Sequence, residues 1–296
     1  MTLHPAATDS GIVFQRADLP GLPQLRASLA TARATPLGLT LRAGSLRIDG
    51  VELLLAALAG CGIDNAVIEL DGPEPPEFDG SAATFAFLIA CAGRAPQDAA
   101  RKAVEVTNTV RLSGPGRYAL LRPGSRPRLR LRGNCGERCS EYRLSEDDFA
   151  RELAPARRVL AAERVEALKA RGLLRGWEPG RGLVRRDGQL ISAQGPRCPD
   201  EDLRFGLCSG LGVLSLLGGP LQGALLLRGG PPGMILRLLR RLMAEESSYR
   251  WTDLPEPEAE SPGALPAGAP DKPRGTLPAA VPGGAAEPAR LAHRRA

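Results

Sequence analysis

Histidine sets the first limit on the chemistry that this chain of 296 residues can perform. Only two histidines are present, His4 near the start and His293 near the end. A zinc site built from several histidines, a serine nucleophile with a histidine base, and a histidine acid–base catalyst in mid-chain are therefore excluded. Carboxylates, cysteines and arginines are the side chains that remain for chemistry.

The cysteines show neither a disulfide framework nor a complete metal motif. Six are present, and Cys135 and Cys139 have a weak zinc spacing with no second matching pair. We therefore expect free thiols in a reducing compartment. The first residues lack both the basic and the apolar region of a signal peptide, so we expect a cytoplasmic protein.

The basic side chains are almost all arginine and are spread along the chain. Lysine occurs only at positions 102, 169 and 272, although the net charge is +6. Because the arginines are interleaved with aspartates and glutamates along the chain and are not paired with aromatic residues, we expect no nucleic-acid partner. Residues 126–132 alternate arginine with leucine, which is typical of a strand with one solvated face and leaves an anion-binding stripe open.

Hydrophobic patterns predict a mixture of strands and helices that would position these side chains. The expected strands lie at 11–16, 65–70, 104–112 and 126–132, and the expected helices at 51–59, 82–91, 161–170 and 235–243, with another beginning at Ser145. Residues 205–227 carry no charge, but seven of them are glycine or proline. A buried helix, a turn and a buried strand are therefore favoured over a membrane span.

Composition also divides the chain. A polar link at 94–101 favours a first domain at 1–98 and a second at 99–251. Residues 252–296 hold nine prolines with alanine and glycine between them, so we expect a disordered tail.

Three passages in the first domain carry a family resemblance. They are GIVFQRADL at 11–19, VELLLAALAGCGIDN at 51–65 and PEPPEFDGSA at 73–82. In order and spacing they resemble UDP-3-O-acyl-N-acetylglucosamine deacetylase, a zinc-dependent hydrolase of lipid A biosynthesis. The resemblance is looser from the end of the first domain to Trp251, and it implies that the chain is expected to begin inside the family pattern.

The resemblance implies a fold and a reaction. The family consists of two-domain α+β proteins in which each domain is a β-sheet layered with a helix pair, and the active site lies between the domains. A zinc ion held by two histidines and an aspartate activates water against the acetamide of a UDP-sugar. A glutamate acts as general base, a third histidine and a lysine stabilise charge, and an apolar passage in the second domain receives the acyl chain.

Of the family's functional residues, this sequence keeps only the general base, at Glu52. The replaced positions are Leu53 and Phe205 for the histidine ligands, Ser209 for the aspartate ligand, Gly206 for the lysine, Val213 for a further aspartate and Gly230 for the third histidine. Leucine and phenylalanine have no donor atom for zinc. We therefore expect no zinc and no other cofactor.

Two consecutive arginines, Arg157 and Arg158, also align with a functional part of the family pattern. Arg158 stands where the family has a substrate-facing threonine, and its long side chain is expected to obstruct the mouth of the acyl passage. Arg157 or Arg158 is also a candidate to bind a phosphate of the substrate.

Three functions follow from these residues. The favoured hypothesis is a divergent, non-catalytic member of the deacetylase family that still binds a UDP-acyl-sugar, an acyl chain or a protein. The first alternative is an active deacetylase whose rearranged metal site uses Glu52 with Cys198, Cys208 or the Cys135/Cys139 pair. The second is an interaction protein that uses the arginine-rich strand and the tail.

Overall fold

We describe the protein from a computed structural model, which describes residues 1–125, 128–132, 139–143, 148–172, 174, 181–229 and 232–254. Residues Met1–Leu254 form one compact unit. The strands of its first half are β1 (Thr2–Pro5), β2 (Ile12–Arg16), β3 (Gln24–Arg26), β4 (Ala32–Thr35), β5 (Gly38–Ala43), β6 (Leu46–Ile48) and β7 (Ala66–Leu70). The later strands are β8 (Lys102–Val106), β9 (Val110–Gly114), β10 (Arg117–Arg122), β11 (Arg128–Arg132), β12 (Cys139–Arg143), β13 (Val159–Ala161), β14 (Leu183–Arg186), β15 (Gln189–Ile191), β16 (Leu221–Gln222), β17 (Ala224–Arg228) and β18 (Tyr249–Asp253). The α-helices are α1 (Glu52–Gly60), α2 (Ala83–Ala92), α4 (Ala162–Ala170), α5 (Glu201–Leu214) and α6 (Pro232–Ala244).

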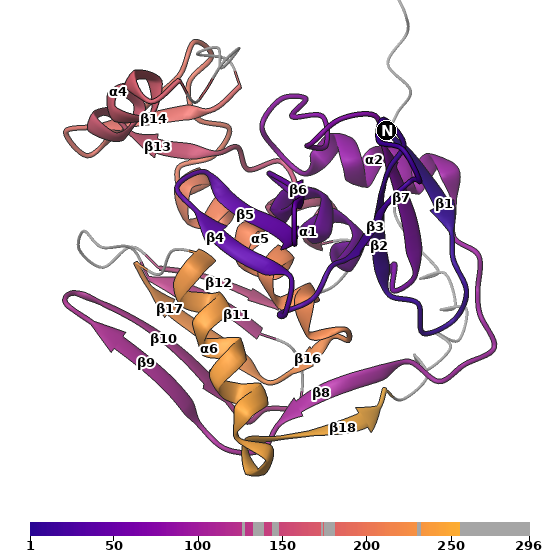
Figure 1. The fold of residues 1–296 in the computed structure, drawn as a ribbon. Helices are drawn as coiled ribbons and strands as arrows, with labels where there is room; N and C mark the ends of the chain where they lie inside the picture. The colour runs from indigo at the N-terminus through magenta and orange to yellow at the C-terminus, as the bar shows by residue number, and fades with distance from the viewer. Residues whose placement is uncertain are drawn as a thin grey trace, which may run out of the picture. The chain divides into compact units, whose positions relative to one another are not determined.

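The first half of the chain builds a four-stranded sheet in the order β1-β7-β2-β3, with β2 and β7 parallel (Figure 1). Alternate residues of β7, namely Ala66, Ile68 and Leu70, are buried, so one face of the sheet is apolar. The same hydrophobic cluster contains the buried leucines of α1, and α2 packs against α1. This half is therefore a sheet layered with a helix pair.

The second half builds a five-stranded sheet in the order β12-β11-β17-β10-β9. Strand β17 pairs parallel with β11 and antiparallel with β10. The inner face carries buried aliphatic side chains from each of these three strands, Leu129, Leu121 and Leu225 among them. Helices α5 and α6 contact this sheet, and Figure 1 shows α6 lying across it. The predicted α+β class with two sheet-and-helix-pair layers is confirmed, while the boundary at residue 98 stays a prediction.

Three smaller sheets complete the described fold. One is the β4-β5-β6 meander, and another joins β8 to β16 and β18. The third, β13-β14-β15, carries α4 and has a small core of Leu160, Val165 and Leu168. Leu37, from the turn between β4 and β5, packs against that core, so the meander and the β13–β15 unit are in contact.

The segment 205–227 forms most of α5, a turn and then β17, as expected. Within the described ranges, no helix is both long and apolar enough to cross a membrane. The single strand expected at 104–112 is wrong, because β8 and β9 belong to different sheets. The backbone N–H of Thr107 donates to Ser248 O at 3.0 Å, which holds the end of β8 beside β18. Of the predicted tail, residues 252 and 253 belong to β18, and 255–296 lie outside the described residues.

Helices α1 and α5 join the two layers by packing against each other at very short range. A Cβ atom built on Gly212 would lie 2.0 Å from the carbonyl oxygen of Glu52. No side chain can be accommodated against backbone at that distance, so the absence of a side chain at Gly212 permits this crossing.

We expect Gly212→Ala to lower the free energy of unfolding by about 3 kcal/mol, because the methyl group must separate two packed helices. Chemical denaturation monitored by circular dichroism measures this change. Gly72→Ala is the matched control, since no atom lies within 4 Å of the added Cβ. Equal unfolding midpoints for the two variants would show that α1 and α5 do not cross as described.

Candidate functional site

The described positions that the resemblance aligns with the general base and the zinc ligands lie on the two helices that pack together. Glu52 is the first residue of α1, with Leu53 next to it, while Phe205, Ser209 and Val213 lie on α5. All except Phe205 are buried, and Phe205 is half-buried against the main core. The predicted positions are therefore gathered at the α1–α5 contact.

Both carboxylate oxygens of Glu52 have partners inside the protein. The side chain is 1% exposed, and its Oε2 accepts a hydrogen bond from Leu39 N–H at 3.0 Å. Its Oε1 lies 2.8 Å from Nη2 of Arg158. Space for the carboxylate is provided by Gly38, where a Cβ would lie 2.1 Å from Oε1. Glu52 is thus a paired, buried anion.

Arg158 brings four separate segments of the chain together. Its guanidinium donates to Glu52 and to the carbonyl oxygen of Leu37, and its Cζ lies 5.7 Å from the ring centroid of Phe205. Its backbone N–H donates to Gly80 O at 3.0 Å. The side chain is only 12% exposed. A buried cation therefore lies between the general-base position and the first ligand position of α5.

The side chains at the family's metal positions do not fit a zinc ion. Zinc requires close nitrogen, sulfur or oxygen donors, which Leu53 and Phe205 lack. Among the described residues, no three histidine, cysteine, aspartate or glutamate side chains are placed to hold a metal. At Gly206, a Cβ would lie 2.4 Å from Cδ2 of Leu131, so this leucine fills the space beside the position that the resemblance aligns with a lysine. Gly230 lies outside the described residues.

Arg157 makes a second buried ion pair, next in the chain to the first. Its Nε lies 2.9 Å from Oε1 of Glu201, and both side chains are almost fully buried, at 1% and 0% exposed. Glu201 also accepts backbone N–H bonds from Arg157 and Arg197. Burial alone would raise the pKa of Glu201, but these hydrogen bonds and the Arg157 charge lower it below its usual value. The candidate phosphate ligand Arg157 is thus paired inside the protein.

Sequence reasoning did not identify Leu39 and Glu201 as partners of the site residues. Glu201 follows Asp200 at the start of α5, and two acids at a helix N-terminus ordinarily stabilise the helix dipole. Leu39 contributes only its backbone N–H, which carries no sequence signal. Neither pattern indicates an interaction with a distant segment.

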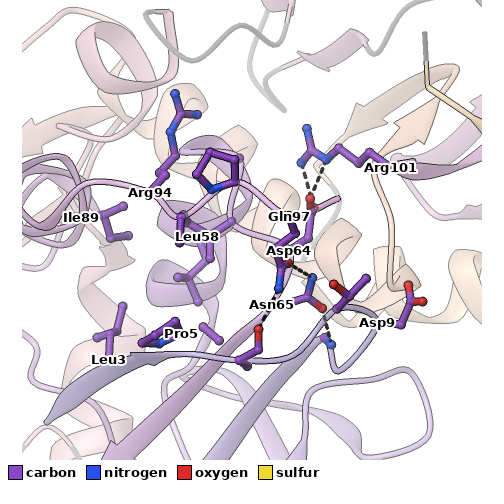
Figure 2. Close-up of a pocket in the computed structure, with 18 of the residues that line it drawn as sticks. Leu3, Pro5, Asp9, Leu58, Asp64, Asn65, Ile89, Arg94, Gln97 and Arg101 are labelled. Carbon is purple, nitrogen blue, oxygen red and sulfur yellow. Dashed lines mark hydrogen bonds and ion pairs between the residues drawn. The ribbon is translucent and has the colours of Figure 1, made fainter. Parts of the chain in front are cut away.

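A separate cavity of about 1730 Å³ lies beside β1 and the segment 92–102 (Figure 2). Leu58 and Ile89 contribute to its apolar lining. On its polar side Asn65 accepts from Gly11 N–H at 2.8 Å and donates to Gln97 Oε1 at 2.8 Å. Arg101 is likewise paired with Asp64. The cavity contains none of the predicted site residues, and its central polar groups hold the segment 92–102 against the first sheet.

The fold and the buried positions on α1 and α5 define a two-layered α+β protein whose candidate site lies where the layers meet. A family model described as UDP-3-O-acyl N-acetylglycosamine deacetylase (LpxC) matches residues 1–244. Because the match covers most of the chain, the protein belongs to this deacetylase family.

We expect Arg158→Met to lower the free energy of unfolding by about 3 kcal/mol, because it leaves the buried Glu52 carboxylate without its cation. Adding Glu52→Gln removes that charge and recovers part of the loss. Urea denaturation of the two single variants and the double variant measures the coupling energy. If the two single effects simply add, the ion pair does not have the role described.

The lowered pKa of Glu201 predicts acid sensitivity. A carboxyl group with a lower pKa in the folded state stabilises the fold above its unfolded pKa, and this contribution is lost as the pH falls through the folded value. Wild-type stability should therefore decline below the usual glutamate pKa of about 4.5 more steeply than that of Glu201→Gln. Thermal melts across this pH range test the difference. Glu166→Gln, at an exposed position, should keep the wild-type slope.

Proposed function

We propose that this chain is a non-catalytic member of the deacetylase family. The observation that supports the proposal is the Glu52–Arg158 ion pair at 2.8 Å. In the family pattern, Glu52 is the general base next to a zinc ligand. In this chain its carboxylate neutralises a guanidinium, and that guanidinium packs on Phe205, at the position of another ligand.

The chemistry of amide hydrolysis supports the same proposal. A general base must reach the water proton that it removes, with a free lone pair and at hydrogen-bond distance. Glu52 is only 1% exposed, and each of its oxygens accepts a hydrogen bond from the protein, so the carboxylate is shielded from solvent water. Water without a metal keeps its high solution pKa, so a lone carboxylate produces little hydroxide. The residues present therefore provide neither an activated water nor an accessible base.

The contacts of the β13–β15 unit concern the binding of an acyl chain. The unit begins directly after Arg158, the residue that the family resemblance aligns with the mouth of the acyl passage. The guanidiniums of Arg158 and Arg164 donate to Leu37 O and Pro36 O, and Leu37 packs on the small core of this unit. We infer that these contacts narrow the entrance for an acyl chain. The ligand that family membership favours is still a UDP-acyl-sugar of lipid A biosynthesis, met in the cytoplasm.

One observation bears on the alternative of a rearranged metal site. Cys208 is close enough to Glu52 to be affected by its charge. Burial, and to a lesser extent that charge, raises the pKa of the Cys208 thiol to about 12. The thiol is therefore protonated at neutral pH, whereas a zinc ligand must be a thiolate. Metal binding at this pair would require the thiol to lose its proton inside the core.

We expect the purified protein to contain far less than one zinc per chain and to release no acetate from UDP-3-O-acyl-N-acetylglucosamine. Metal analysis and a deacetylase assay on one preparation measure both properties. A full equivalent of zinc together with turnover would overturn the proposal. Turnover that survives Glu52→Ala would instead exclude a rearranged site built on this residue.

A repaired variant serves as the positive control. It combines Leu53→His, Phe205→His and Ser209→Asp with Arg158→Thr, which restores the donor set and removes the guanidinium. Zinc uptake by this variant, and not by Arg158→Thr alone, is the result expected if the family positions converge as the alignment implies. A folded variant that takes up no zinc would show that α5 is aligned in the wrong register.

A further inference from the structure

The outer face of the five-stranded sheet carries a group of arginines that the candidate site does not use. Side chains alternate between the two faces of a strand, so the residues between the buried aliphatic ones point outward. The exposed arginines set on this face by that alternation and by the strand register are Arg111, Arg122, Arg128, Arg130 and Arg228, here called the arginine face.

The strand register places these arginines around an apolar centre. Arg128 and Arg122 lie on opposite sides of Ala224. In the next row, Arg130 pairs with Leu226, which in turn pairs with Leu120 on β10. Because adjacent strands are about 4.8 Å apart, Arg122 and Arg128 are separated by roughly 10 Å at the backbone. The result is a basic area in which the partly exposed Leu226 and Ala224 and the buried Leu120 lie between the charges.

Little negative charge on the described strands balances this face. The five strands of the sheet contain one acidic residue, Glu141, which pairs with Arg130 at 3.6 Å. The side chains of Arg122, Arg128 and Arg228 make no hydrogen bond or ion pair with any described residue. Within the described part of the chain, no group therefore competes with an external anion for these three guanidiniums, and guanidinium groups bind phosphate oxygens in a bidentate way.

We propose that the arginine face docks the protein on the surface of an anionic phospholipid bilayer. Guanidiniums spread over two dimensions match phosphates that are spread over a membrane plane. The partly exposed Leu226 and the stems of the arginines provide apolar surface for the boundary between headgroups and acyl chains. This inference is independent of whether the chain retains deacetylase activity.

A single-stranded nucleic acid is a poorer match to the same surface. Such polymers are bound by basic grooves in which aromatic side chains stack on successive bases. On the described part of this face the one aromatic residue is Tyr118, which is half-buried and lies under the guanidinium of Arg111 at 5.9 Å. Aliphatic residues occupy the centre, where a stacking platform would be needed.

Co-sedimentation of the full chain with vesicles tests the proposal. Vesicles of equal parts phosphatidylglycerol and phosphatidylcholine should bind the protein, and vesicles of phosphatidylcholine alone should not. An arginine near an anionic surface strengthens binding about fivefold, so Arg122→Glu, Arg128→Glu and Arg228→Glu together should weaken it on the order of a hundredfold. Binding should also fall as salt is raised, because the charges are screened.

A matched control separates the position of the charges from the net charge. Arg171→Glu, Arg186→Glu and Arg237→Glu change the net charge by the same amount at exposed positions on other elements. This control should bind vesicles distinctly better than the arginine-face variant. If the glutamate substitutions unfold the sheet, a variant with glutamine at Arg122, Arg128 and Arg228 replaces the arginine-face variant in the same binding assay. The proposal is overturned if the wild-type protein does not bind anionic vesicles, or if both triple variants lose vesicle binding equally. It is also overturned if the arginine face binds poly-uridine RNA and not vesicles.

Discussion

The close crossing of α1 and α5 is the constraint on which the rest of the described structure depends. It joins a helix of the first sheet layer to a helix of the second, and the absence of a side chain at Gly212 allows the backbones to approach. The same crossing buries Glu52, Ser209 and Val213. The family resemblance aligns functional positions with both helices, so packing and the geometry of these positions cannot vary independently. The contact between the helices is maintained by packing, with side chains that lack donor atoms at Leu53 and Phe205.

Two consecutive arginines stabilise the beginnings of these two helices. Glu52 is the first residue of α1 and Glu201 is the first residue of α5, and both carboxylates are buried. Arg157 pairs with Glu201, while Arg158 pairs with Glu52. Neighbouring side chains in extended backbone point in opposite directions, which lets adjacent residues reach different helices. The short segment before β13 is therefore a structural link between the two layers.

The sequence predicted those parts of the fold that depend on local patterns. The apolar run of α1 ends before Gly62, and α2 ends before Gly93, as expected from helix stop signals. The alternation of β11 also predicted one buried and one exposed face. By contrast, β4 to β6 are short and carry little alternation, so their pairing depends on tertiary contacts. The partner of Glu52 lies 106 residues away along the chain, and no local feature marks it.

The sequence likewise predicted the positions of the candidate site but not the contacts between them. Family spacing predicted Glu52 as the general-base position and Leu53, Phe205 and Ser209 as replaced ligand positions, and it drew attention to Arg158. It did not show that Arg158 and Glu52 are bonded to each other, because that depends on the turn at Leu37 and on the room left by Gly38. Arg157 looked equivalent to its neighbour in sequence, yet it is paired with a different helix.

The contacts of Arg158 also bear on whether histidines can be introduced at the positions that the resemblance aligns with zinc ligands. A histidine introduced at Phe205 while Arg158 is present would place a basic ring beside a guanidinium, without a complete set of donors. Replacing Arg158 first would leave the carboxylate of Glu52 buried and unneutralised. Each single change is therefore unfavourable, and only a concerted change avoids both intermediates. The contacts of Arg158 consequently oppose the stepwise assembly of a metal site at these positions.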